Sequence, residues 1–290
     1  MEPSGPWRMV WKQLRRDWVA VGAAVVILAI VGLAVCAPLV AQVTRHGVDT
    51  QYRTTGLTAD GLPRPPSREF WLGTDDLGRD VLVRIAYGAR TSLLVGVAAT
   101  GMAVAIGLVA GLVAGYFGGA VDTVVARLVD LVLSLPFLLF AIALVSVTGP
   151  GLAIVIVVIG AFSWASVARI VRGLVLSIRE REYVEAARAL GASSWRILRV
   201  AVLPNIAGPV LVYTTLLIPT VIVAEATLSF LGLGAPPPTP TWGAMLNEAV
   251  HYYQVAWWYV VFPGAALLVT TLAFNLLGDG IRDAVAGADR

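Results

Sequence analysis

The sequence carries little charge for its length. Of its 290 residues, 58% are hydrophobic and only 13% are charged, whereas a soluble globular domain carries about 25% charged residues. Water cannot solvate such a surface over its whole extent, and the mean hydropathy of +0.81 agrees. The composition therefore excludes an ordinary soluble domain. It predicts an all-α integral membrane protein whose partner is lipid and not nucleic acid.

Lysine is nearly absent, since the 21 basic residues include only Lys12. A phosphate-binding P-loop needs a lysine directly after its glycines, and Lys12 stands in Val-Trp-Lys-Gln-Leu. The chain is therefore not expected to hydrolyse ATP by that route. Histidine is scarce as well, because His46 and His251 are the only two and form no His-Glu-x-x-His site. We predict no catalytic residue and no metal site, which disfavours the alternative of an intramembrane enzyme.

A single cysteine, Cys36, excludes an internal disulfide. The preceding Leu-Ala-Val resembles a lipoprotein cleavage signal, but Val35 is bulky for the position before the cysteine. The surrounding apolar stretch also exceeds the core of about 7–15 residues that a signal peptide has. We expect a retained helix with Cys36 as a small apolar side chain.

Six apolar stretches have the length of about 20 residues that a spanning helix needs. They cover residues 18–41, 91–116, 124–147, 152–174, 205–230 and 255–277. We divide the chain into 1–90, a spanning helix with an external segment, and 91–290, a core with a cytoplasmic segment at 176–204. Residues 78–92 have helical apolar spacing and predict a short helix along the outer interface.

The distribution of basic residues sets the orientation. With both termini in the cytoplasm, 14 of the 21 basic residues fall on the cytoplasmic side and seven on the outside, all within residues 42–90. The positive-inside rule favours this topology, although the seven outer residues stand against it. We predict a multi-pass protein of the bacterial cytoplasmic membrane.

The cytoplasmic segment 176–204 holds an unusual arginine-rich pattern. Its first half favours a helix, Gly191 is a natural helix stop, and Ser193 or Ser194 can cap a second helix that leads to Pro204 and the next span. Three charged anchors on the first helix suit docking to a soluble partner. These are Glu182, Glu185 and Arg188. A plain amphipathic connector between two spans is the alternative.

This segment resembles the cytoplasmic loop with a Glu-Ala-Ala motif that is found in permease subunits of binding-protein-dependent ABC importers. The residues that carry the resemblance are Glu185, Ala186, Ala187, Gly191, Leu203 and Pro204. The chain departs at Ala201, where the family often has isoleucine. The resemblance implies that Glu182, Arg188 and the motif residues dock on an ATPase subunit and couple its closure to the pore.

Other segments are similar to the C-type permease of the dipeptide, oligopeptide and nickel importer group. They lie at 72–80, 87–93, 115–119, 226–234 and 274–283, while Phe70 and Val83 depart from the group pattern. The resemblance implies the permease fold of type I, methionine-importer-like ABC importers. It also implies a second homologous permease in a heterodimer, two ATPase subunits that bind ATP and Mg²⁺, and an extracytoplasmic substrate-binding protein. This chain itself would bind no cofactor.

Several polar residues outside this segment also invite an interpretation. Glu225 in the fifth span, with Asp75, Arg79 and Asp80 in the external segment, is a candidate for the external gate or for binding-protein contact. For Glu225 we favour an interfacial carboxylate that reaches water or caps a neighbouring helix. We further expect a local ion pair between Arg127 and Asp130. Aromatic residues near the sixth span predict an interfacial belt, and they are Trp242, Tyr252, Tyr253, Trp257, Trp258 and Tyr259.

Two questions stay open at the level of sequence. A peptide substrate is implied by the resemblance, but a nickel chelate or a modified peptide would suit the same role. An ion-coupled secondary transporter is the less favoured alternative, because coupling carboxylates near the membrane midplane and an inverted repeat would be expected there. Neither feature is evident in the sequence.

Overall fold

A computed structural model describes residues 6–288, and its regular elements are helices. They are α1 (Pro6–Leu14), α2 (Trp18–Val35), α3 (Ala37–Thr44), α4 (Val81–Phe117), α5 (Gly119–Ser134), α6 (Phe137–Thr148), α7 (Leu152–Arg179), α8 (Glu182–Ala189), α9 (Ser194–Ile197), the π-helical turn η1 (Leu198–Val202), α10 (Leu203–Phe230), α11 (Trp242–Ala249) and α12 (Trp257–Ala288). Five helices are long and apolar enough to cross a membrane, or six if α5 and α6 together form one span. The all-α membrane fold is confirmed.

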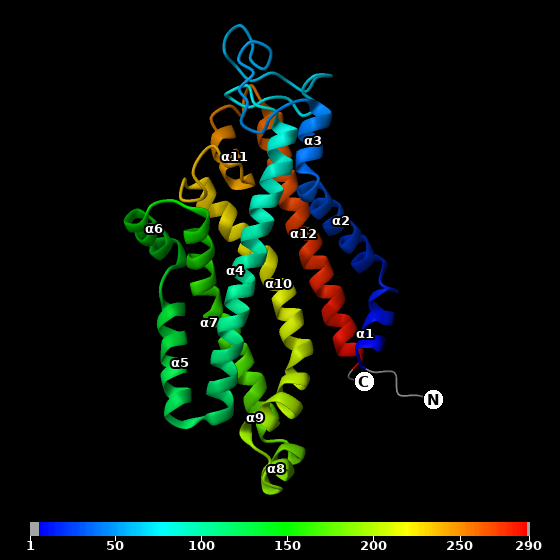
Figure 1. Cartoon of the computed structure of the whole chain (residues 1–290), viewed down its shortest axis with the longest axis vertical. Coiled ribbons are helices and arrows are strands. Elements are labelled where there is room, and N and C mark those ends of the chain that lie inside the picture. The colour runs from blue at the N-terminus through cyan, green and yellow to red at the C-terminus, as the bar shows by residue number, and fades with distance from the viewer. Residues whose placement is uncertain (1–5, 289–290) are drawn as a thin grey trace.

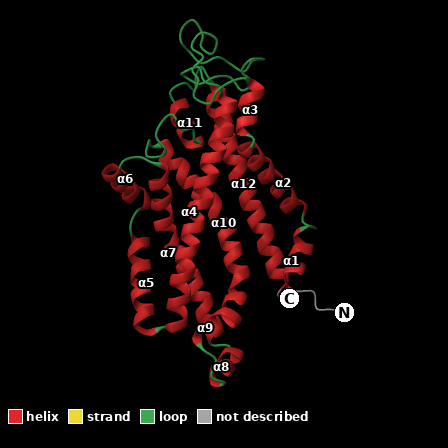
Figure 2. Cartoon of the chain, in the orientation of Figure 1, coloured by secondary structure: helices red, strands yellow, loops and turns green. Residues whose placement is uncertain are grey.

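The molecule is elongated, and its two ends differ. Helices α1, α8 and α9 and the end of α12 lie at one end, and α3, α11 and the long external segment lie at the other (Figure 1). Most of the irregular chain belongs to this second end (Figure 2). Both ends of the described chain therefore lie at the same end as the arginine-rich segment, as the predicted topology requires.

Helix α4 runs along the centre of the bundle, in close contact with α7 (Figure 1). Gly107, Gly111 and Gly115 of α4 face α7, and a methyl group on Gly111 would lie 2.6 Å from Cβ of Val171. Small residues at this spacing let two backbones approach closely. Helices α10, α12 and α2 pack beside this pair.

Helix α4 corrects one prediction. Residues 78–92 do not form a separate interfacial helix, because Asp80 caps α4 and the helix then continues without a break for 37 residues. The carboxylate of Asp80 accepts hydrogen bonds from the backbone N–H groups of Leu82 and Val83. At 1.5 Å per residue the helix is about 55 Å long, which exceeds the bilayer's hydrocarbon thickness of about 30 Å.

Two predicted spans are broken where the sequence has proline. The first span divides at Cys36, and Pro38 lies in the first turn of the following helix α3. The third span divides between α5 and α6, which meet at 86°. Pro136 lacks an N–H group and holds Leu135 in an extended conformation, so the helix cannot continue. The expectation of one continuous helix over 124–147 is wrong.

Candidate functional site

The arginine-rich cytoplasmic segment folds as a helix, a glycine corner and a second helix, as its sequence predicts. Glu182 and Glu185 lie in the first turn of α8, where the partial positive charge of a helix N-terminus stabilises carboxylates. Gly191 has a φ of 82°, a left-handed conformation that glycine adopts without strain. The Ser193 hydroxyl then accepts a hydrogen bond from the N–H of Arg196 and caps α9.

This unit presents apolar side chains at the cytoplasmic tip of the molecule. Leu190 is 88% exposed and Trp195 is 70% exposed, and α8 and α9 form the lower tip in Figure 1. Exposed beside them are the motif residues Glu182, Glu185, Ala186, Arg188 and Gly191, whereas Ala187 is half-buried. Exposed apolar groups with charged neighbours mark an interaction surface, and this end of the chain extends beyond the span-forming helices.

The other face of α8 is fixed to the end of α4. Val184 is fully buried in the main core cluster, which also contains Tyr116 of α4. The guanidinium of Arg188 lies 5.9 Å from the centre of the Tyr116 ring, within the range of a cation–π contact. Arg179, just before α8, donates to the carbonyl of Gly115 at 3.0 Å. These contacts join α8 and the end of α7 to the cytoplasmic end of α4.

Leu203 and Pro204 lie apart from α8, at the start of α10. The π-helical turn η1 separates them from α9. Pro204 occupies the first turn, where a missing N–H group leaves no hydrogen bond unmade. These two residues therefore join the cytoplasmic unit to the fifth span and do not belong to its exposed tip.

At the opposite end, five side chains from four parts of the chain form a largely buried external cluster. They are Asp75, Arg79, Arg84, Glu248 and Tyr259. Arg79 and Arg84 each place a nitrogen near Glu248 Oε2, at 3.1 and 3.2 Å. Both also pair with Asp75. The Tyr259 hydroxyl donates to Glu248 at 2.9 Å. The cluster thus connects the external segment, α4, α11 and α12.

The charges of this external cluster nearly balance one another. Burial raises the pKa of the Asp75 carboxyl, against the opposing effect of Arg79 and Arg84. Burial lowers the pKa of Arg79, but Asp75 and Glu248 outweigh this effect and raise it. Asp75, Asp76 and Glu248 have oxygens within 4.8 Å of one another. Because two guanidinium groups already occupy these oxygens, the cluster is not proposed as a metal site.

Asp80 and Glu225 lie outside the external cluster. Asp80 caps α4 and contacts Nδ1 of His46 at 2.6 Å. Glu225 is only 1% exposed and accepts hydrogen bonds from Ser92 at 2.9 Å and Ser229 at 2.6 Å. The expectation that Glu225 reaches water is wrong, because α4 closes over it. A role for Asp75, Arg79, Asp80 or Glu225 in gating stays a prediction.

Sequence reasoning missed Arg84, Glu248 and Tyr259. The presence of charged residues near helix ends was the available signal, but Arg84 and Glu248 are 164 positions apart along the chain. The predicted aromatic belt is wrong for Trp242, Trp258 and Tyr259, which are buried. Trp242 donates to the carbonyl of Ile85, and Trp258 donates to that of Thr74.

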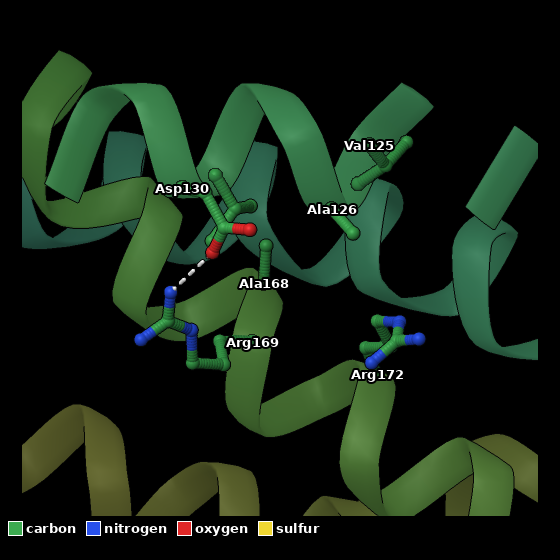
Figure 3. A pocket seen from close by; sticks show the side chains of 7 residues that line it. Val125, Ala126, Asp130, Ala168, Arg169 and Arg172 are labelled. Carbon is green, nitrogen blue, oxygen red and sulfur yellow. Dashed lines mark hydrogen bonds and ion pairs between the residues drawn. The ribbon is translucent and has the colours of Figure 1, made fainter. Parts of the chain in front are cut away.

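Near the cytoplasmic end, ion pairs connect α5 to α7. Arg169 pairs with Asp130 at 2.8 Å (Figure 3), and Arg172 pairs with Asp122. A cavity of about 150 Å³ lies between these two pairs. The predicted local pair of Arg127 with Asp130 is wrong, since α7 supplies the partner instead.

Comparisons with known proteins agree with these features. Residues 107–287 match the family described as binding-protein-dependent transport system inner membrane component. Residues 5–59 match the N-terminal transmembrane domain of oligopeptide transport permease C.

Full-length relatives are similar as well. A glutathione transport system permease protein of Escherichia coli O6:K15:H31 is 42% identical, over 97% of this chain and 90% of its own. A dipeptide transport system permease protein of Alkalihalophilus pseudofirmus is 40% identical, over 97% of this chain and 89% of its own. Another, from Bacillus subtilis, is 42% identical, over 95% of this chain and 83% of its own.

Proposed function

This chain belongs to the family of binding-protein-dependent transport system inner membrane components, and we propose that it forms half of the translocation pathway of an importer for di- and oligopeptides. It is a multi-pass inner membrane permease subunit of an ABC transporter and is not the catalytic subunit. The peptide substrate is supported by relatives that are named for dipeptide and for glutathione transport. A nickel chelate or a modified peptide would be handled by the same architecture.

The observation that carries the coupling role is the exposed tip of α8 and α9. Leu190 and the charged face of α8 lie beyond the ends of the membrane-spanning helices, and Trp195 lies at the cytoplasmic start of the fifth span. An ATPase subunit with an apolar cleft would bury these side chains. Glu182, Glu185 and Arg188 would set the orientation of docking, because complementary charges fix register more than they add affinity.

The remaining partners follow from the same role. ATP and Mg²⁺ would be held by two ATPase subunits, and this chain would bind no cofactor of its own. A second, homologous permease would complete the pathway in a heterodimer. An extracytoplasmic binding protein would deliver the substrate to the end of the molecule that contains the external cluster.

Co-purification after mild detergent extraction tests this function. Wild type is expected to bring down a second membrane chain and a P-loop ATPase. Glu185→Arg reverses a charge on the exposed face of α8 and is expected to lose the ATPase while it keeps the second permease. Glu69→Arg makes the same charge change in the exposed external segment and should keep both partners.

Two other results would contradict the proposal. Retention of the ATPase by Glu185→Arg, together with undiminished peptide uptake, would show that α8 is a plain connector. Purification of wild type as a stable monomer, with uptake that follows an ion gradient in the absence of ATP, would favour the secondary transporter.

A further inference from the structure

Arg90 is the exposed arginine of the outer half of α4. Arg79 and Arg84, the two arginines before it, are buried in the external cluster. Arg53 donates to Gln51, and Arg64 donates to the carbonyl of Leu57. Among residues 6–288, no carboxylate lies within ion-pair distance of Arg90, and its guanidinium lies over the face of the Tyr87 ring, 5.7 Å from the ring centre.

A groove between α2 and α4 surrounds this arginine. It has a volume of about 390 Å³, and Arg90 is the one polar residue among those that line it. Val31 and Val35 of α2 form one wall, and Leu94 and Val97 of α4 form the other. These four side chains are exposed in the chain. Their apolar surface is suited to contact with the acyl chain of a lipid.

The depth of Arg90 places it near the outer membrane surface. Helix α2 has 18 residues, so it rises about 27 Å from its cytoplasmic end and nearly crosses a hydrocarbon layer of about 30 Å. Val35, the last residue of α2, lines the same groove as Arg90. Tyr87 precedes Arg90 on α4, toward the external end, so the guanidinium points outward as a snorkelling side chain does.

We propose that this groove binds one phospholipid of the outer leaflet, with its phosphate on Arg90 and an acyl chain between α2 and α4. An arginine that faces lipid without an anion is costly. A phosphate diester supplies both the opposite charge and the oxygen acceptors that a guanidinium prefers. An anionic headgroup such as phosphatidylglycerol is favoured, because it brings no ammonium group to compete with Arg90.

Native mass spectrometry of the permease assembly, extracted in mild detergent and mixed with phosphatidylglycerol, tests the site. Wild type is expected to retain one more lipid on this chain than Arg90→Gln does. The apparent affinity of the variant should be about tenfold lower, as for the loss of a charge-assisted hydrogen bond. Arg68→Gln removes an exposed arginine of the external segment and should bind as wild type does. Arg90→Lys should restore part of the affinity.

Two further probes separate the parts of the site. Diacylglycerol with the same acyl chains lacks the phosphate and is expected to bind weakly, while glycerol phosphate lacks the chains and is expected not to bind. Equal retention of phosphatidylglycerol by wild type and Arg90→Gln would overturn the proposal, and so would equal retention of diacylglycerol and phosphatidylglycerol. If Arg90→Gln does not assemble, Val31→Trp, which fills the groove and leaves Arg90 in place, should also lose the lipid.

Discussion

Arg84 and Glu248 lie 3.2 Å apart although 164 positions separate them in the chain. This contact attaches the start of α4 to α11 and holds the external end of the bundle together. Arg84 is 1% exposed, and its Nη1 atom has no hydrogen-bond partner among the described residues. Glu248 and Asp75 together compensate this buried charge.

Glu248→Gln should lower the free energy of unfolding by about 3 kcal/mol, because it removes the carboxylate that two buried guanidinium groups share. Thermal unfolding in detergent would measure the change. Glu69→Gln removes an exposed carboxylate of the external segment and should leave stability within about 0.5 kcal/mol of wild type. Equal stability of the two variants would show that the external cluster does not stabilise the fold.

Gly111→Ala should destabilise the protein by about 1–3 kcal/mol, since its new methyl group would lie 2.6 Å from Cβ of Val171 and force α4 away from α7. Gly101→Ala is the matched control, because no atom lies within 4 Å of the position. That change should be neutral or stabilising, as alanine favours helix. The same unfolding measurement decides between close packing and a general intolerance of α4 to substitution.

Ser92→Ala should cost about 1–3 kcal/mol, because it leaves an oxygen of the buried Glu225 without its donor. Thr227→Ala removes a hydroxyl on the same helix as Glu225 that donates only to the backbone one turn earlier, and we expect little change. Peptide uptake should fall with Ser92→Ala if the contact between α4 and α10 also sets the external gate. Reduced stability with full uptake would assign Glu225 a structural role alone.

Gly191→Val should reduce peptide-stimulated ATP hydrolysis by the assembled importer, because a β-branched residue at a φ of 82° is strained and would turn α9 away from α8. No atom of a neighbouring residue lies within 4 Å of a Cβ placed there, so we expect the effect to come from backbone conformation. Gly191→Asn should retain most activity, since asparagine tolerates the left-handed region. Loss of activity in both variants to the same degree would refute this explanation.

The features that the sequence predicted best are those with local causes. The unit of α8, Gly191 and α9 follows from helix propensity, a glycine stop and a serine cap within a few residues, and the structure has each of them. A few neighbouring residues are enough to determine this local structure.

The predictions that the structure contradicts depend on contacts between distant parts of the chain or, in one case, on a proline within an apolar stretch. Asp130 pairs with Arg169 of another helix rather than with Arg127, and periodicity within one helix cannot show which neighbour lies opposite. The burial of Glu225 depends in the same way on α4. The break at Pro136 was visible in the sequence, but the apolar length of the third span outweighed it.

Helix α4 begins at the external cluster and ends where Tyr116 contacts the unit of α8. A stiff rod of about 55 Å that turns by about 5° around one end displaces its other end by about 5 Å. Such a rod needs no relay of side-chain rearrangements through the membrane. If α4 moves as a rigid body, its tight glycine contacts with α7 would put the pivot in the half of α4 nearer the cytoplasm. A small displacement of the cytoplasmic end of α4 would then move its external end by a larger distance.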